Sequence, residues 1–175
     1  MENKKKHIIA AAVSILFVAN AHSAIQGEAG TVEFTGQIVA PTCSVSPGSL
    51  GQTVDLGLVS AEIFNNGGKS TAKDFSIELV NCNIDTATHA SVLFSGETLT
   101  DETILKTSDS DTTKIGIEIL QDGTPIILDG VTPTSEQELV IGENSLRFAA
   151  RYTAVSPDFS PGEANATANF IMQYE

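Results

Sequence analysis

The sequence has 175 residues and a formal net charge of −13 at pH 7. This length is sufficient for one domain with a hydrophobic core and leaves little room for a second. The acidic balance disfavours nucleic acid and anionic membrane surfaces as partners, because both carry negative charge. Solubility alone also explains the acidity, so the charge excludes partners without selecting one.

The N-terminus has the pattern of an export signal. Lys4, Lys5 and Lys6 precede an apolar run at residues 8–19, and residues 20–24 are small and suit cleavage. A transmembrane helix needs about 20 apolar residues, more than this run supplies. We therefore expect a signal peptide at residues 1–23, with cleavage after Ser23. Its removal leaves 6 basic and 21 acidic residues, a net charge of −15.

Residues 30–39 alternate between an apolar row and a polar row, which is the period of a β-strand. The apolar row consists of Gly30, Val32, Phe34, Gly36 and Ile38; the polar row consists of Thr31, Glu33, Thr35 and Gln37. Pro41 then separates this stretch from the rest of the chain. Two interpretations remain open: the first strand of an ordinary sandwich, or a strand that inserts into another molecule.

The remainder of the chain reads as short strands joined by polar turns. Alternation or extended character predicts strands at residues 43–45, 53–59, 73–82, 91–95, 114–121, 125–128, 139–141, 145–155 and 165–175. Residues 61–64 suit one helical turn, residues 96–113 a surface excursion, and Asp122-Gly123 a hairpin turn. The pattern favours an all-β sandwich.

The final strand also has an apolar row, formed by Ala168, Phe170, Met172 and Tyr174. The chain stops one residue after Tyr174, and Pro41 separates its first strand from the rest of the chain. Such a sandwich could lack one strand of its own sheet.

Cys43 and Cys82 are the two cysteines, and both follow the signal. In an exported chain this count predicts one disulfide. Closing a loop of about 40 residues should stabilise the fold by about 4 kcal/mol. A metal pair is the alternative, but His89 is the only histidine after the signal and no third soft ligand lies near either cysteine.

The order of these features resembles the chaperone–usher pilins, the structural subunits of type 1-like fimbriae. The shared features are the signal, the alternating arm with a glycine, a cysteine soon after the arm and a second at the end of a central strand. Pilins also carry a penultimate tyrosine and a glycine 14 residues from the end, where this sequence has Tyr174 and Gly162.

The resemblance implies an incomplete immunoglobulin-like β-sandwich that lacks its last strand and is completed by a donor strand from the next subunit. The chain would then consist of a signal peptide at residues 1–23, a donor-strand arm at residues 24–41 and a pilin domain at residues 42–175. The apolar row of residues 30–38 would be the donor, and Gly162 with the apolar row of the final strand would belong to the acceptor groove. Implied partners are copies of itself or other fimbrial subunits, a periplasmic chaperone and an outer-membrane usher. The implied route runs through the periplasm to a fimbrium at the cell surface.

Other function classes have less support in the sequence. His89 has no nucleophile or base partner in a recognisable motif, so we expect no enzyme activity and no cofactor or metal. A freestanding secreted carbohydrate-binding sandwich would favour aromatic platforms, and this chain has no Trp and two Tyr. A major shaft subunit and a minor adaptor pilin remain alternatives within the family.

Overall fold

The computed structural model describes residues 28–36, 42–65, 67–109 and 114–175. The chain divides into two units, Met1–Ile38 and Val39–Glu175, called the arm and the body below and described separately. The predicted signal peptide, Gln37 and Ile38 lie outside the described residues. Residues 28–36, the described part of the arm, are not assigned to a strand.

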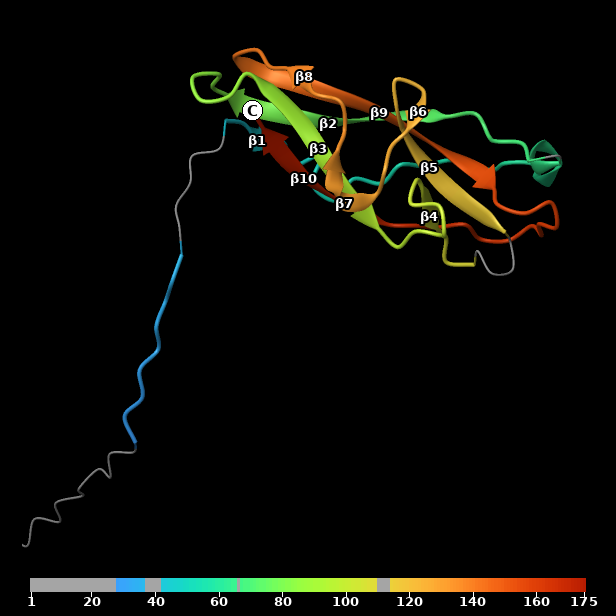
Figure 1. Cartoon of the computed structure of the whole chain (residues 1–175), viewed down its shortest axis with the longest axis horizontal. Helices are drawn as coiled ribbons and strands as arrows, with labels where there is room; N and C mark the ends of the chain where they lie inside the picture. The colour runs from blue at the N-terminus through green and yellow to red at the C-terminus, as the bar shows by residue number, and fades with distance from the viewer. Residues whose placement is uncertain (1–27, 37–41, 66, 110–113) are drawn as a thin grey trace, which may run out of the picture. The chain divides into compact units, whose positions relative to one another are not determined.

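The body contains two antiparallel sheets, seen in Figure 1 as two layers of arrows. The larger sheet has the strand order β1-β2-β9-β5-β4, with β6 paired to β5. Its strands are β1 (Ser44–Val45), β2 (Lys73–Cys82), β9 (Gly142–Ala154), β5 (Ile115–Gln121), β4 (Ile104–Lys106) and β6 (Thr124–Pro125). The central pair, β2 and β9, keeps one register from Lys73↔Ala150 to Leu79↔Asn144.

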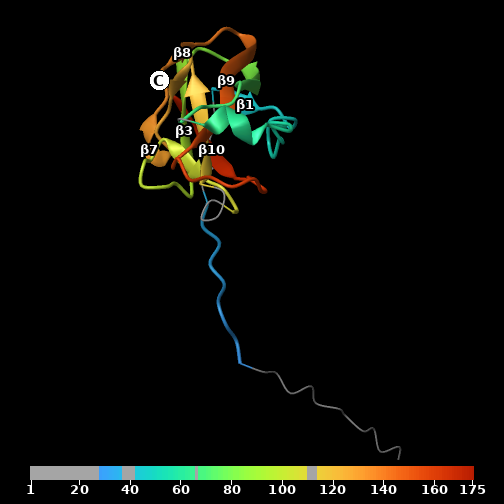
Figure 2. The same ribbon diagram turned by 90° about the vertical axis from the view of Figure 1, so that its right-hand side faces the viewer.

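The smaller sheet has the order β10-β3-β7, with β8 also paired to β3, and Figure 2 shows it from the side. Its strands are β10 (Ala168–Tyr174), β3 (His89–Gly96), β7 (Asp129–Pro133) and β8 (Gln137–Glu138). The last strand of the chain, β10, therefore stands at an edge of this sheet. Its one strand neighbour among the described residues is β3.

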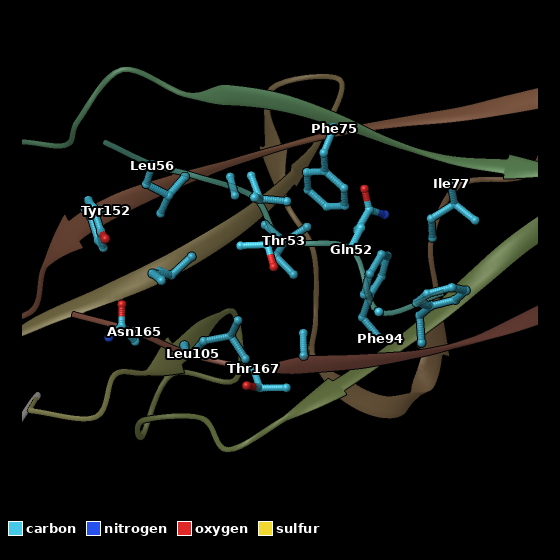
Figure 3. A pocket seen from close by; sticks show the side chains of 18 of the residues that line it. Gln52, Thr53, Leu56, Phe75, Ile77, Phe94, Leu105, Tyr152, Asn165 and Thr167 are labelled. Atoms are coloured by element: carbon cyan, nitrogen blue, oxygen red, sulfur yellow. The ribbon is translucent and has the colours of Figure 1, made fainter. Parts of the chain in front are cut away.

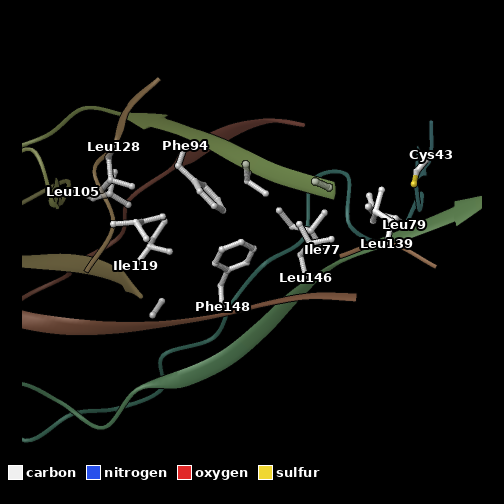
Figure 4. Close-up of a cluster of buried hydrophobic side chains, with 14 of the residues drawn as sticks. Cys43, Ile77, Leu79, Phe94, Leu105, Ile119, Leu128, Leu139, Leu146 and Phe148 are labelled. Atoms are coloured by element: carbon white, nitrogen blue, oxygen red, sulfur yellow. The ribbon is translucent and has the colours of Figure 1, made fainter. Parts of the chain in front are cut away.

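The core lies between the two sheets (Figure 4). Each inward row follows from strand alternation. The rows include Ile77 and Leu79 from β2, Val92 and Phe94 from β3, and Leu146 and Phe148 from β9, all buried. The rings of Phe94 and Phe148 meet edge to face across the sheets, with centroids 5.1 Å apart. The predicted all-β sandwich and the inward faces of these strands are confirmed.

Local turn chemistry also follows the sequence. Asp122 and Gly123 both have positive φ, 49° and 79°, which a two-residue hairpin of the primed type requires. The predicted helical turn is the 3-10 helix η1 (Ala61–Phe64), and the side chain of Ser60 caps it by accepting from the Glu62 backbone N–H.

The predicted surface excursion at residues 96–113 is wrong in part, because it contains β4, whose Leu105 is buried. Two glycines allow this: a Cβ on Gly96 would overlap the Leu105 side chain, and one on Gly116 would overlap Ile104. Because the segment is mostly polar, its composition did not predict a strand, although three of its residues are apolar and pack against neighbouring strands.

Three predicted strands differ from the structure. Residues 53–59 form no strand, a point that matters for the site below. The strand expected at 125–128 is reduced to β6, and the one expected at 139–141 lies earlier, at β8, with Leu139 buried just after it. Within the described residues, no helix is long and apolar enough to cross a membrane.

Candidate assembly groove

An open groove runs along the body between two stretches of chain that are not bonded to each other. It has a volume of about 460 Å³, with residues 49–56 on one side and residues 164–170 on the other. Figure 3 shows Gln52, Thr53 and Leu56 along the first wall and Asn165 and Thr167 along the second. In Figure 3 the two walls run in opposite directions, since the chain approaches Tyr152 from Gln52 to Leu56 and moves away from it from Asn165 to Thr167.

The floor of the groove is the hydrophobic core itself. Phe75, Ile77 and Phe94 line it, and the Phe94 and Phe170 rings lie 6.3 Å apart. Phe75, Leu56, Ala168 and Phe170 pack on the core but remain partly exposed. A folded sandwich normally covers such residues with a strand, so this opening exposes apolar area that a further strand could remove from water.

Both walls also carry backbone groups without partners. β10 pairs with β3 along one edge only, and among the described residues no backbone–backbone hydrogen bond joins residues 51–59 to anything. A strand lying in the groove would find donors and acceptors on both sides, as strand addition requires.

One end of the body holds the disulfide. Cys43 and Cys82 are bonded as predicted, and the Tyr174 hydroxyl donates to the Cys43 carbonyl at 3.3 Å. Burial raises the pKa of the Tyr174 phenol above its ordinary value, so the hydroxyl stays a donor. The Glu175 carbonyl accepts from the backbone N–H groups of Thr88 and His89, each at 2.8 Å. We call this end of the body the disulfide end.

The other end opens into a second hollow of about 190 Å³ beside η1. Tyr152 and Ala164 line both hollows, so the second continues the first. The rings of Phe64 and Phe159 meet there with centroids 5.8 Å apart. Burial, with a smaller effect from the Asp55 carboxylate, raises the pKa of the Tyr152 phenol. We call this end, formed by residues 57–64 and 156–162, the helical-turn end.

The acceptor residues expected from the sequence fall in this region. Ala168 and Phe170 line the main groove, and Gly162 lines the second hollow. Met172 and Tyr174 continue the row toward the disulfide end, where they pack on the core.

The sequence missed the opposite wall. Val54 and Leu56 were assigned to an ordinary strand, yet they line the groove. The alternating pattern of residues 53–59 indicates an extended segment with one apolar face. It does not indicate which strand pairs with that segment.

In the arm, the expected donor side chains are open to solvent. Phe34 is 92% exposed and Val32 is 74% exposed. A Cβ added at Gly30 or Gly36 would meet nothing within 4 Å, so nothing in the free arm requires glycine at these positions. Ile38, the last member of the row, lies outside the described residues.

Over residues 28–36, 42–65, 67–109 and 114–175, no three side chains of His, Cys, Asp or Glu are grouped as metal ligands would be. The apolar groove, open edges and extended arm are instead suited to binding a strand.

Known proteins resemble this chain in sequence and in fold. The family described as "Fimbrial protein" matches residues 32–175. The chain belongs to the fimbrial protein family. It is 41% identical over 174 residues to a type 1 fimbrial subunit of Salmonella typhimurium, covering 93% of this chain and 94% of that one. It is 37% identical to the type 1 fimbrial protein A chain of Escherichia coli strain K12, covering 96% of each.

Solved structures agree. The crystal structure of the P pilus rod subunit PapA matches with a TM-score of 0.69 and 28% identity, covering 77% of this chain and all of that one. A chaperone–usher pilus structure described in connection with rod uncoiling matches with a TM-score of 0.70 and 30% identity, covering 89% of this chain and all of that one. This chain is thus a structural component of a surface pilus of the chaperone–usher type, and its relatives are structural fimbrial subunits rather than enzymes.

Proposed function

We propose that this fimbrial subunit polymerises by strand insertion, with residues 30–38 of each newly added copy filling the groove of the copy added before it. The observation that carries the proposal is the unfilled groove: its floor is apolar, residues 51–59 on one wall have no strand neighbour among the described residues, and β10 on the other wall pairs along one edge only. A chain whose arm bears an exposed apolar row supplies the complementary strand.

Dimensions and chemistry support the match. A strand rises about 3.3 Å per residue, so Val32, Phe34, Gly36 and Ile38 present side chains at intervals of about 6.6 Å. Burial of Val32, Phe34 and Ile38 would contribute roughly 1.5–3 kcal/mol each before ordering costs. Gly36 would be needed only after insertion, where a bulky groove residue fills the space of the missing side chain.

The same groove explains the proposed route of assembly. An uncovered groove and an unpaired edge invite aggregation, so a periplasmic chaperone would cover it with a strand of its own until the next subunit arrives at the outer-membrane usher. Residues 1–23 would direct export to the periplasm, residues 24–41 would form the donor arm, and residues 42–175 the acceptor body. We take the role to be that of a shaft subunit rather than a minor adaptor, because a rod subunit is among the solved structures that match this chain.

The test compares two adjacent arm positions in cells that supply the chaperone and usher. Phe34→Asp should abolish the ladder of heat-labile multimers seen in mild detergent, because an unpaired charge in the groove costs several kcal/mol. Thr35→Asp, on the polar row of the same arm, should leave the ladder intact. Normal multimers from the Phe34→Asp subunit would refute the proposal.

A reciprocal pair tests the groove. Phe170→Asp should prevent both chaperone binding and acceptance of the next subunit, since Phe170 lines the groove. Ile171→Asp places the same charge on the opposite, 64% exposed face of β10 and should do neither. Equal behaviour of the two variants would show that the groove is not the acceptor.

A further inference from the structure

Two pairs of exposed apolar side chains mark opposite ends of the body. At the disulfide end, Val140 and Ile141 are 59% and 75% exposed, and the next residue, Gly142, pairs with Cys82. At the helical-turn end, Leu58 is fully exposed and Ile63 is 45% exposed. β9 spans the distance between the ends with 13 residues, and Figure 1 shows β8 in the half of the body that holds the C-terminus and the helical turn at the opposite end.

The arm fixes which part of a donor copy reaches the groove. Only residues 39–42 separate Ile38, the last residue of the donor row, from Cys43. Five steps of extended chain from Ile38 to Cys43 span at most about 18 Å. If strand insertion proceeds as proposed above, on which this inference rests, the disulfide end of the donor body must lie within that distance of one end of the recipient's groove.

The direction of insertion decides which end this is. β10 runs toward the disulfide end, where Tyr174 bonds to Cys43. A donor strand parallel to β10 would therefore bring the donor's disulfide end to the recipient's disulfide end. The recipient's own arm leaves from the same place, so two neighbours would compete for one end of each body.

Antiparallel insertion removes this conflict. The disulfide end of the donor then meets the helical-turn end of the recipient, and each end of every body faces one neighbour. Such a head-to-tail contact repeats without closing and generates a filament. It also brings together the two pairs of exposed apolar side chains.

We infer that Val140 and Ile141 of one copy pack against Leu58 and Ile63 of the copy whose groove its arm fills. The occupant of each patch is a second copy of this chain. This contact removes four apolar side chains from water and limits rotation about the short link between arm and body. Val131, 77% exposed, lies on β7 of the smaller sheet and takes no part in it.

Crosslinking of assembled fimbriae tests the contact. Leu58→Cys and Ile141→Cys together, treated with a short bismaleimide reagent, should give a ladder that survives boiling in detergent. Either substitution alone should give no ladder, and Leu58→Cys with Val131→Cys should give none. Crosslinking by Ile141→Cys alone would show that two disulfide ends meet, which overturns the inference.

The outcomes separate this inference from the proposed function. Heat-labile multimers without boiling-resistant crosslinks, both in the Leu58→Cys/Ile141→Cys variant and in a second Ile63→Cys/Val140→Cys variant, would overturn the end contact and leave strand insertion standing. Failure of the unsubstituted subunit to form heat-labile multimers would refute the proposed function itself. If the first variant fails to assemble, the ladder expected from the second pair decides the contact.

Discussion

β2 and residues 53–59 carry the same alternating pattern but differ in structure. β2 is bonded to β9 along most of its length and to β1 near its end. Residues 53–59 have no strand neighbour within the described residues. In β2 the inward Ile77 and Leu79 are fully buried, while Val54 and Leu56 are only partly covered and Leu58 is fully exposed.

The difference teaches that alternation specifies the two faces of a segment but not its pairing. A strand needs an edge to bond to, and that edge can come from elsewhere in the chain or from another molecule. Residues 53–59 border a groove whose other wall includes β10, a strand that pairs with β3 along one edge only. Their pattern therefore matches a sheet that the isolated chain cannot complete.

The largest expected effect comes from supplying the missing strand within one chain. A copy of residues 28–39, joined after Glu175 by a short Gly-rich linker with the native arm removed, should fill its own groove. Burial of its apolar row is worth roughly 1.5–3 kcal/mol per large side chain, against a few kcal/mol for closing the linker. The thermal midpoint should rise, and the amide protons of residues 53–59 should become protected from exchange.

A copy shifted by one residue is the matched control. It directs Thr31, Glu33, Thr35 and Gln37 into the groove, because a one-residue slip exchanges the two faces of a strand. Equal thermal midpoints for the two registers would show that the arm is not a register-specific donor, and the difference between β2 and residues 53–59 would need another explanation.

Sequence reasoning succeeded where the partner of a segment lies in the same chain. The bounds of β2, the inward face of β9 and the Asp122-Gly123 hairpin all follow from local pattern and turn chemistry. It failed at Leu105, because the glycines that admit β4 act through contacts distant in sequence.

Only one wall of the groove could be predicted from the sequence. The apolar row on β10 was read as one wall from the resemblance to pilins, but nothing local distinguishes residues 53–59 from an ordinary strand. The depth of the groove depends on core residues such as Phe75 and Phe94, which any sandwich would bury. That Phe75 remains partly exposed here is a property of the whole topology, which alternation does not encode.

The second prediction concerns the covalent link beside β2. Replacing Cys43 and Cys82 together by serine should destabilise the body by about 4 kcal/mol in the chain-entropy view, given the 39-residue separation. The measurement is urea unfolding of the self-complemented form, so that assembly does not interfere. In the unsubstituted protein, both thiols should resist alkylation and the mass should be two daltons lower than that of the reduced chain. A free thiol pair in native fimbriae would contradict this.

The third prediction compares the two segments residue by residue. Leu79→Ala should destabilise the free body by about 3 kcal/mol, since Leu79 is fully buried and truncation leaves a cavity. Leu56→Ala should cost about 1 kcal/mol or less, because Leu56 is already partly exposed. In the self-complemented form the cost of Leu56→Ala should increase. Unchanged cost there would mean that the inserted strand does not cover this wall.

The smallest effect lies on the outer face of the paired segment. The Glu78 carboxylate on β2 accepts hydrogen bonds from Ser76 Oγ at 2.6 Å and, across the ladder, from Ser145 Oγ at 2.8 Å. These bonds hold the pKa of Glu78 below its ordinary value, with a smaller contribution from the charge of Arg147. Because the folded-state pKa lies below the unfolded one, the bonds stabilise the fold above the unfolded value of about 4.3. This contribution is lost as the pH falls through the folded-state pKa.

Ser145→Ala should therefore raise the pKa of Glu78 in an NMR titration, and the difference in unfolding stability from the unsubstituted protein should shrink as the solution is acidified. Glu78→Gln, which removes the titrating group, should make the Ser145→Ala effect independent of pH. Since Ser145 reaches Glu78 only because β9 pairs with β2, an unchanged Glu78 pKa would show that this cross-strand bond does not form in solution. Such bonds require a paired neighbour, which residues 53–59 would acquire under the proposed strand insertion.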